Sequence, residues 1–226
     1  METDAGQGSD RLACPSRATF EIYNADFCSV LERVGLFTCI ITDPPYPDYH
    51  VELYGYEDIS FLQDYDCRQL VFWSAKVDFP IDYSAIHIWD KKTGAGSEYE
   101  RIFEINGQAN YKVFRHYLIN STVAASYTRD IFTGHPSQKP ILLMREMVQK
   151  FTSPGDTVID MFMGSGSTGV ACLELGRSFI GIEKQTKWFN IAKRRLESAQ
   201  PALFTTEGGA TQLELGTSES MVPSND

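Results

Sequence analysis

The chain has 226 residues, of which 42% are hydrophobic and 12% aromatic, so it can bury the core of one globular domain. Its longest apolar runs, such as residues 35–42, are far shorter than the roughly 20 residues that a membrane helix needs. Five cysteines without a C-x-x-C pair favour neither a disulfide framework nor a zinc site, and the polar, acidic start does not resemble a leader peptide. We therefore expect a cytoplasmic protein that does not bind a membrane.

The formal net charge of −10 is concentrated at the two ends. Residues 1–10 contribute −3 and residues 196–226 contribute −5, which leaves −2 for the rest of the chain. A nearly neutral body can still carry a basic face for nucleic acid. The composition predicts a flexible N-terminus at 1–16, a single domain at 17–200 and a disordered acidic tail at 201–226.

The first part of the chain alternates strand patterns with one short helical pattern. The predicted strands are, in chain order, residues 18–24, 36–42, 69–74, 84–90, 101–105 and 111–119. An amphipathic helix is predicted at 25–34, and a mobile loop with two lysines and two glycines at 91–100.

The second part alternates helices and strands regularly. Helices are predicted at 140–151, 164–176 and 185–199, and strands at 157–162 and 178–183. The helix at 164–176 opens with a glycine-rich turn. Such alternation indicates an α/β fold with a doubly wound, mostly parallel sheet, in which ligands bind at the carboxyl ends of strands near the topological switch point.

The glycine-rich turn follows a strand, as a nucleotide-binding turn does. Gly164, Gly166 and Gly169 fit G-x-G-x-x-G, and Glu183 follows about 20 residues later, the spacing of an acid that binds ribose hydroxyls. The pattern is common to NAD and S-adenosylmethionine sites, and a purely structural turn is the alternative. This motif alone therefore does not identify the ligand.

The segment "TDPPYP", at 42–47, ends the buried strand at 36–42. A carboxylate and backbone carbonyls held rigid by two prolines are all acceptors, and Tyr46 adds a flat ring beside them. Acceptors next to a stacking ring suit a planar amine such as the exocyclic amino group of a nucleobase, whereas hydride transfer does not need them. The alternative is a stiff loop with a surface tyrosine.

Four motifs in this order, "TDPPY", "GHPSQKP", "DMFMGSGSTGVA" and "FIGIE", resemble the permuted, beta-class amino-group DNA methyltransferases, which methylate adenine N6 or cytosine N4. In that class the catalytic motif precedes the cofactor motif. The resemblance covers about residues 18–198 and implies a Rossmann-like methyltransferase fold of circularly permuted motif order. Met161 departs from the family, which usually has proline there.

The resemblance also implies roles for individual residues. The catalytic residues would be Asp43, Pro44, Pro45 and Tyr46, with Asp43 and the Pro44 carbonyl accepting from the amino group and Tyr46 stacking on a flipped base. The residues implied to contact S-adenosylmethionine are Asp26, Asp43, His135, Ser137, Lys139, Asp160, Phe162, Gly164, Ser165, Gly166, Ser167 and Glu183. Glu183 would bind the ribose, and His135, Ser137 and Lys139 the amino-acid end. No metal is implied.

The resemblance implies adenine in DNA as the substrate, because Asp rather than Ser begins the catalytic motif. Cytosine N4, an RNA base and a catalytically silent binding subunit stay open as alternatives. Lys91 and Lys92 are candidate phosphate contacts or simply part of a solvated loop. The segment available for target recognition, about 118–133, is short, so specificity would come from a few loop residues, from a homodimer or from a second specificity subunit, or it would be relaxed.

Overall fold

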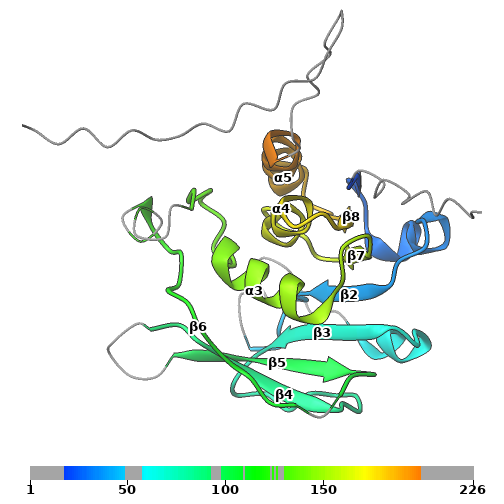
Figure 1. Ribbon diagram of the computed structural model, residues 1–226, viewed down its shortest axis with the longest axis vertical. Coiled ribbons are helices and arrows are strands. Elements are labelled where there is room, and N and C mark those ends of the chain that lie inside the picture. The colour runs from blue at the N-terminus through cyan, green and yellow to red at the C-terminus, as the bar shows by residue number, and fades with distance from the viewer. Residues whose placement is uncertain are drawn as a thin grey trace, which may run out of the picture.

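The computed structural model describes residues 18–48, 58–92, 98–108, 110–122, 124, 126 and 130–199. Its eight strands are β1 (Phe20–Tyr23), β2 (Cys39–Thr42), β3 (Arg68–Trp73), β4 (Ala85–Asp90), β5 (Tyr99–Ile105), β6 (Val113–Arg115), β7 (Thr157–Asp160) and β8 (Ser178–Ile182). They form one sheet in the order β1-β8-β7-β2-β3-β5-β4-β6 (Figure 1). The predicted segments 1–16 and 201–226 lie outside the described residues.

The sheet is parallel except at one strand. β5 runs antiparallel to both of its neighbours, β3 and β4, whereas every other pairing is parallel. The chain passes from β2 to β3 on one side and returns through β7 to β8 on the other, so β2 and β7 flank the topological switch point. The predicted α/β class with a mostly parallel sheet is confirmed.

Three α-helices form one contiguous layer. They are α3 (Ile141–Phe151), α4 (Ser167–Glu174) and α5 (Thr186–Ala199). α4 packs between the other two and against β7 and β8, and α5 also contacts β1 (Figure 1). The parallel strands β2, β7 and β8 are almost wholly buried and consist mainly of Ile, Val and Phe, as expected for strands covered on both faces.

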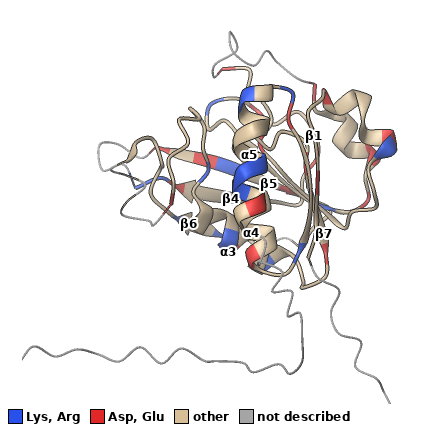
Figure 2. Ribbon diagram, turned by 90° about the horizontal axis from the view of Figure 1, so that it is seen from above, with Lys and Arg blue, Asp and Glu red and all other residues tan. Residues whose placement is uncertain are grey.

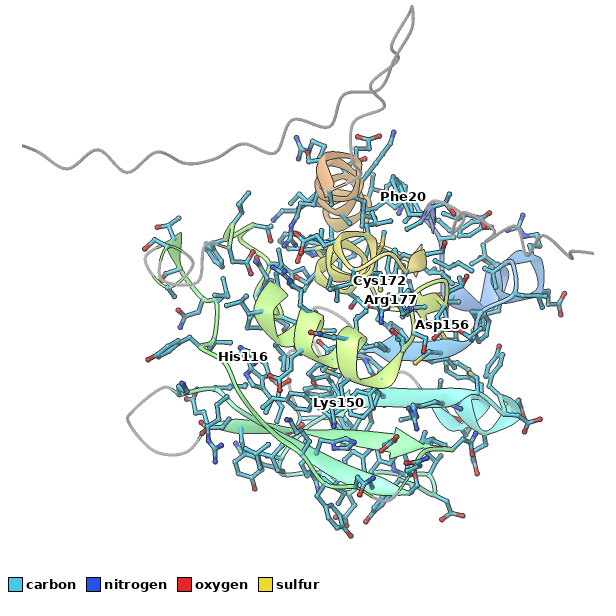
Figure 3. The ribbon with its side chains drawn as sticks, in the orientation of Figure 1. Phe20, His116, Lys150, Asp156, Cys172 and Arg177 are labelled. Carbon is cyan, nitrogen blue, oxygen red and sulfur yellow. The ribbon has the colours of Figure 1, made fainter. Side chains whose placement is uncertain are left out.

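The helical layer is fixed to the sheet by buried side chains. Cys172, inside α4, is fully buried, and Arg177 at the start of the following strand is 5% exposed (Figure 3). Arg177 donates to the backbone and side-chain oxygens of Thr152, just beyond α3. The end of α3 is thereby tied to the turn between α4 and β8. No disulfide joins the cysteines that the structure describes.

Three of the predicted elements differ in the structure, and one of them, the strand predicted at 111–119, is only the three residues Val113–Arg115 of β6. Residues 25–34 form two short 3-10 turns, Phe27–Ser29 and Leu31–Arg33, instead of an amphipathic α-helix. The Asp26 carboxylate accepts from the Cys28 N–H and closes the first turn tightly. The predicted loop 91–100 ends early, because Tyr99 and Glu100 already belong to β5. A further 3-10 helix, Ser60–Asp64, had no counterpart in the sequence prediction.

Charge is mixed over the described part of the molecule. Basic and acidic positions are interspersed along the ribbon as a whole, whereas the charged residues of α5 are mainly basic (Figure 2). Among the helices that the structure describes, none has the length and apolar character needed to cross a membrane.

Candidate functional site

Three acids follow or end neighbouring parallel strands. Asp43 follows β2, Asp160 ends β7 and Glu183 follows β8, and these strands lie next to one another in the order β8-β7-β2. Since parallel strands end at the same edge of the sheet, the "DPPY" motif and the glycine-rich turn meet there, although more than 100 residues separate them. This edge is the candidate site.

Asp160 organises the glycine-rich turn. One carboxylate oxygen accepts from the Thr42 hydroxyl at 2.9 Å and from the Phe162 N–H at 3.1 Å, and the other accepts from the Thr168 hydroxyl at 2.7 Å. These bonds connect the end of β2, the turn and the start of α4. Burial raises the pKa of Asp160 to about 7 even though all three partners are donors.

Glycine is favoured at two positions of the turn for different structural reasons. Gly164 has φ +50°, and a Cβ there would lie 3.1 Å from His135 Nε2, which lines the cavity described below. Gly166 has φ +81°, and a Cβ there would lie 2.9 Å from the Ala192 Cβ of α5. Gly164 therefore keeps space beside the cavity, whereas Gly166 allows close packing of α5 against the turn.

A cavity of about 320 Å³ opens at the strand ends. The predicted site residues that line it are Asp26, Asp43, Pro44, Pro45, Tyr46, His135, Ser137, Phe162, Gly164 and Glu183. A narrow extension of about 30 Å³ is lined by four more of them, Lys139, Asp160, Ser165 and Ser167. Among the predicted cofactor contacts, Gly166 is absent from both linings.

The wall of the cavity of about 320 Å³ combines aromatic rings with carboxylates. The rings of Phe27 and Phe162 have centroids 5.1 Å apart. Glu183 Oε2 accepts from the Gly164 N–H at 3.0 Å and Oε1 from the Gln185 N–H at 2.7 Å, and burial raises the pKa of Glu183. Each of its oxygens keeps a second lone pair for a ligand hydroxyl. The cavity can therefore hold a flat ring against this aromatic wall, with ligand hydroxyls hydrogen-bonded to Glu183.

Asp26 stands at the same cavity. Besides capping the first 3-10 turn, its carboxylate lies 2.9 Å from Lys184 Nζ, and this ammonium group is the main reason that the pKa of Asp26 is lowered. Lys184 and Gln185, which also line the cavity, were not singled out from the sequence. Both directly follow Glu183, and only the acid matched a motif.

The "HPSQKP" segment contributes to both the cavity and its extension. The His135 ring accepts from the Ser137 N–H at 3.2 Å and lies edge-on to Trp188, with centroids 4.5 Å apart. Burial, together with the nearby positive charge of Lys139, lowers the pKa of His135 to about 4, so the ring is neutral at pH 7. The Gln138 side chain accepts from the Thr133 N–H at 2.9 Å and donates to the Ile131 carbonyl at 2.7 Å.

A cluster of charged groups surrounds Asp43. Its Oδ1 accepts from the Tyr46 hydroxyl at 2.5 Å, and its Oδ2 lies 2.5 Å from Lys139 Nζ. The same ammonium lies 3.1 Å from Glu100 Oε2, and Glu100 Oε1 lies 2.8 Å from Lys91 Nζ. Lys139 was expected at the amino-acid end of a cofactor, but its charged end lies with the two carboxylates.

The pKa values of this cluster follow from burial and pairing. Burial raises the pKa of Asp43, although Lys139 opposes the shift. Burial also acts to raise the pKa of Glu100, but the ammonium groups of Lys139 and Lys91 outweigh it and hold that pKa below its usual value. The two carboxylates in turn raise the pKa of Lys139 in spite of its burial, so Lys139 stays charged.

A second cavity, of about 520 Å³, adjoins the first. Tyr46 and Ser137 line both cavities, and Trp89, Tyr99, Glu100 and Lys91 line the second. Tyr46 is 7% exposed, and its ring centroid lies 5.7 Å from that of Trp73. Tyr46 therefore stands between two spaces large enough for small planar groups.

The two lysines proposed as phosphate contacts are placed differently. Lys91 is paired with Glu100 and lies over the Trp89 ring at 5.3 Å. Lys92 has φ 52° and lies over the Tyr117 ring at 5.1 Å, outside the lining of the three cavities described.

Glu100 is the main site residue that sequence reasoning missed. It was assigned to the end of a mobile loop, and no motif contains it. The available signal was the alternation in "YERIFEI", which continues the strand back to Tyr99. Arg195 of α5 was also missed; it donates to the Ser165 carbonyl at 2.6 Å and pairs with Asp130 at 3.5 Å.

The comparison with family models gives one match. A model of the N6_N4_Mtase family, described as DNA methylase, matches residues 68–194, which is more than half of the chain. The matched part contains "GHPSQKP", the glycine-rich turn and Glu183, whereas "DPPY" precedes it.

Curated relatives also match part of the chain. The type II methyltransferase M2.DpnII of Streptococcus pneumoniae is 36% identical over 105 residues, which are 39% of this chain and 39% of the relative. The DNA adenine methyltransferase YhdJ of Escherichia coli (strain K12) is 28% identical over 175 residues, which are 63% of this chain and 58% of the relative. The matched part thus spans less than two thirds of either relative.

Solved structures share the fold. The M1.HpyAVI–SAM complex superposes with a TM-score of 0.54 at 24% identity, over 79% of this chain and 100% of that chain. The cytosine-N4-specific PvuII DNA methyltransferase gives a TM-score of 0.57 at 13% identity, over 79% of this chain and 86% of that chain. At these identities the likeness supports the fold alone.

Proposed function

The chain belongs to the DNA methylase family of N6 and N4 amino-group methyltransferases, and from this premise we propose that it transfers a methyl group from S-adenosylmethionine to the N6 amino group of adenine in DNA. The observation that carries the proposal is the position of Asp43. Its carboxylate lines the cavity that contains Glu183, and it bonds the tyrosine that separates this cavity from the second one. An acceptor for an amino group thus stands where two ligand spaces meet.

The first cavity, of about 320 Å³, suits S-adenosylmethionine. Phe27 and Phe162 offer apolar walls to an adenine ring, and Glu183 offers two carboxylate oxygens to ribose hydroxyls. The space beside Gly164, which a side chain would narrow toward His135, allows the backbone to approach the ligand closely. When bound, this cofactor supplies an electrophilic methyl group on a positively charged sulfur.

Asp43 and the Pro44 carbonyl would act on the amino group of the target base. In an aromatic amine the nitrogen lone pair is delocalised into the ring, which makes the nitrogen a weak nucleophile. Acceptors that hold both N–H bonds draw the nitrogen toward a pyramidal form and stabilise the positive charge that develops on it. Pro45 fixes the turn that presents these acceptors.

Tyr46 and the second cavity would receive the base. An amino group inside the duplex cannot be reached, so the target nucleotide has to leave the stack. The cavity of about 520 Å³, with Tyr46, Trp89 and Tyr99 in its lining, offers aromatic surface to a base next to Asp43. Lys91 and Lys92, at the end of β4, are the proposed contacts to the DNA backbone.

Adenine is the proposed base for two reasons. The catalytic motif begins with Asp43, which favours adenine over cytosine in this class, and the relative YhdJ is named a DNA adenine methyltransferase. We place the enzyme on DNA in the cytoplasm. A homodimer or a second specificity subunit would supply what the short segment at about 118–133 lacks for target recognition.

The test is nucleoside analysis by mass spectrometry after incubating the protein and S-adenosylmethionine with duplex DNA or with RNA. We expect N6-methyladenine in DNA, and at least about 100-fold slower formation with Asp43→Ala at unchanged cofactor affinity. Detection of N4-methylcytosine would identify cytosine instead of adenine as the target base. Methylation of RNA but not of DNA would identify RNA as the substrate. Cofactor binding without methylation of either would indicate a silent binding subunit.

A further inference from the structure

Glu100 is a buried acid at the site that the proposed reaction does not yet use. Its side chain is 13% exposed and that of Lys139 is 8% exposed. Asp43, Glu100, Lys139 and Lys91 carry two negative and two positive charges within ion-pair distance of one another. The cluster is therefore neutral as a whole, which allows four charged groups to be buried together.

The antiparallel direction of β5 explains how Glu100 reaches this position. The parallel strands contribute residues that follow their carboxyl ends, whereas β5 begins at that same edge. Glu100, the second residue of β5, thus faces Lys139 at the carboxyl edge of its neighbours. The rings of Phe72 and Trp89, 4.8 Å and 5.8 Å from Lys139 Nζ, hold the ammonium from the sheet side.

Both donors that occupy Asp43 also reach Glu100. Lys139 Nζ lies 2.5 Å from Asp43 Oδ2 and 3.1 Å from Glu100 Oε2. The Tyr46 hydroxyl lies 2.5 Å from Asp43 Oδ1 and 3.3 Å from the same Glu100 oxygen. Rotation of the hydroxyl proton about the C–O bond is enough to redirect the Tyr46 hydrogen bond from Asp43 to Glu100.

This sharing matters for Asp43 as an acceptor. A carboxylate that is engaged fully by an ammonium and a hydroxyl is a weaker acceptor for a further N–H group. We propose that Glu100 is a positioning residue for methyl transfer, which takes up part of the bonding of Lys139 and Tyr46 so that Asp43 can accept from the amino group of the target base. This inference rests on the function proposed above.

The charged groups around Asp43 predict how the pH dependence of the methylation rate should change when Glu100 is replaced. Asp43 faces Lys139, Tyr46 and Glu100, and Asp160 lies close enough to interact with it electrostatically. The negative charge of Glu100 acts to raise the pKa of Asp43. Removing that charge should lower the pKa and move the acid limb of the rate profile to lower pH.

The main variant is Glu100→Gln, which keeps the size of the side chain. Single-turnover methylation of duplex DNA should slow by roughly 10- to 100-fold, as is typical when a partner that orients an active group is removed. The cofactor dissociation constant should change by less than about threefold, because Glu100 is absent from the lining of the first cavity, which is proposed for the cofactor. The matched control for charge is Glu197→Gln on the exposed face of α5, which should keep the parental rate.

A double-mutant cycle with Tyr46→Phe separates positioning from a general structural role. If Glu100 acts partly through the Tyr46 hydroxyl, Glu100→Gln should cost less in the Tyr46→Phe background than in the parent. Circular dichroism and thermal melting of each variant verify folding.

Two results would overturn the inference while the parent enzyme remains active. One is a parental rate and an unshifted acid limb for Glu100→Gln. The other is a loss of rate that accompanies a loss of folding, with no shift of the acid limb and no coupling to Tyr46. A parent protein that neither binds S-adenosylmethionine nor methylates DNA would instead refute the proposed function itself.

Discussion

Glu183→Gln is the sharpest test of the cofactor site, because it changes one atom of a side chain whose surroundings are defined. Each carboxylate oxygen of Glu183 accepts one backbone N–H, from Gly164 at 3.0 Å and from Gln185 at 2.7 Å. A glutamine amide has only one acceptor oxygen. One of the two N–H groups would therefore face an NH2 group and lose its acceptor.

The magnitudes follow from these contacts. An unsatisfied N–H in this half-buried position should lower the free energy of unfolding by about 1–3 kcal/mol. Hydrogen bonds from ribose hydroxyls to a charged acceptor contribute about 1.5–3 kcal/mol, so their loss should weaken cofactor binding by roughly 10- to 150-fold. The rate at saturating cofactor should fall much less, since Glu183 does not contact the amino group.

The assay is calorimetric titration with S-adenosylmethionine and with its demethylated product, combined with thermal melting. Both ligands should raise the melting temperature of the parent, because they bind only the folded state. Asp43→Asn serves as the comparison variant and should weaken cofactor binding much less than Glu183→Gln does. An unchanged dissociation constant in folded Glu183→Gln would refute the assignment of the ribose site.

Tyr46→Phe keeps the ring and should retain most of the methylation rate, whereas Tyr46→Ala should lose roughly 1–3 kcal/mol of base stacking, measured as a fall in kcat/KM for DNA. Because burial lowers the pKa of His135 from about 6.5 to about 4, the folded state binds fewer protons between these values. Up to about 3 kcal/mol of unfolding free energy should be lost as the pH falls through this range, and urea titrations of His135→Gln should lack that loss. Gly166→Ala combines φ +81° with a contact of 2.9 Å to Ala192, so its melting temperature should fall by several degrees, and by more than in Gly155→Ala, which has φ +91° but open space.

Much of the fold could be predicted because the local patterns are strong. Strands β2, β7 and β8 are short apolar runs bounded by turn residues, and α3 and α5 have clear helical periodicity. The segment at 25–34 was predicted wrongly as an α-helix. Ten residues offer few i to i−4 bonds against the cost of helix nucleation, and the Asp26 cap favours a tighter turn.

The site was predictable where motifs follow parallel strands. Asp43 and Glu183 were singled out from motifs that follow strands and Asp160 from the family resemblance, and the structure brings the three together because parallel strands end at one edge of the sheet. Glu100 could not be found in this way, since the pattern of a strand does not reveal its direction. The pairing of Lys139 with Glu100 was missed for the same reason, since it depends on β5 running antiparallel.

The pairing of β4 with β5 determines where the chain can vary in length and sequence without displacing Lys91 or Glu100. Lys91 and Glu100 are held by the ladder that ends with Asp90 opposite Tyr99 and continues through the bond from the Lys91 N–H to the Glu98 carbonyl. Both charged residues are thus anchored before the chain leaves the sheet. The connection between them can be lengthened, shortened or exchanged without moving either charge, so it is a place where new contacts to the proposed DNA substrate can be introduced while the proposed catalytic residues stay unaltered.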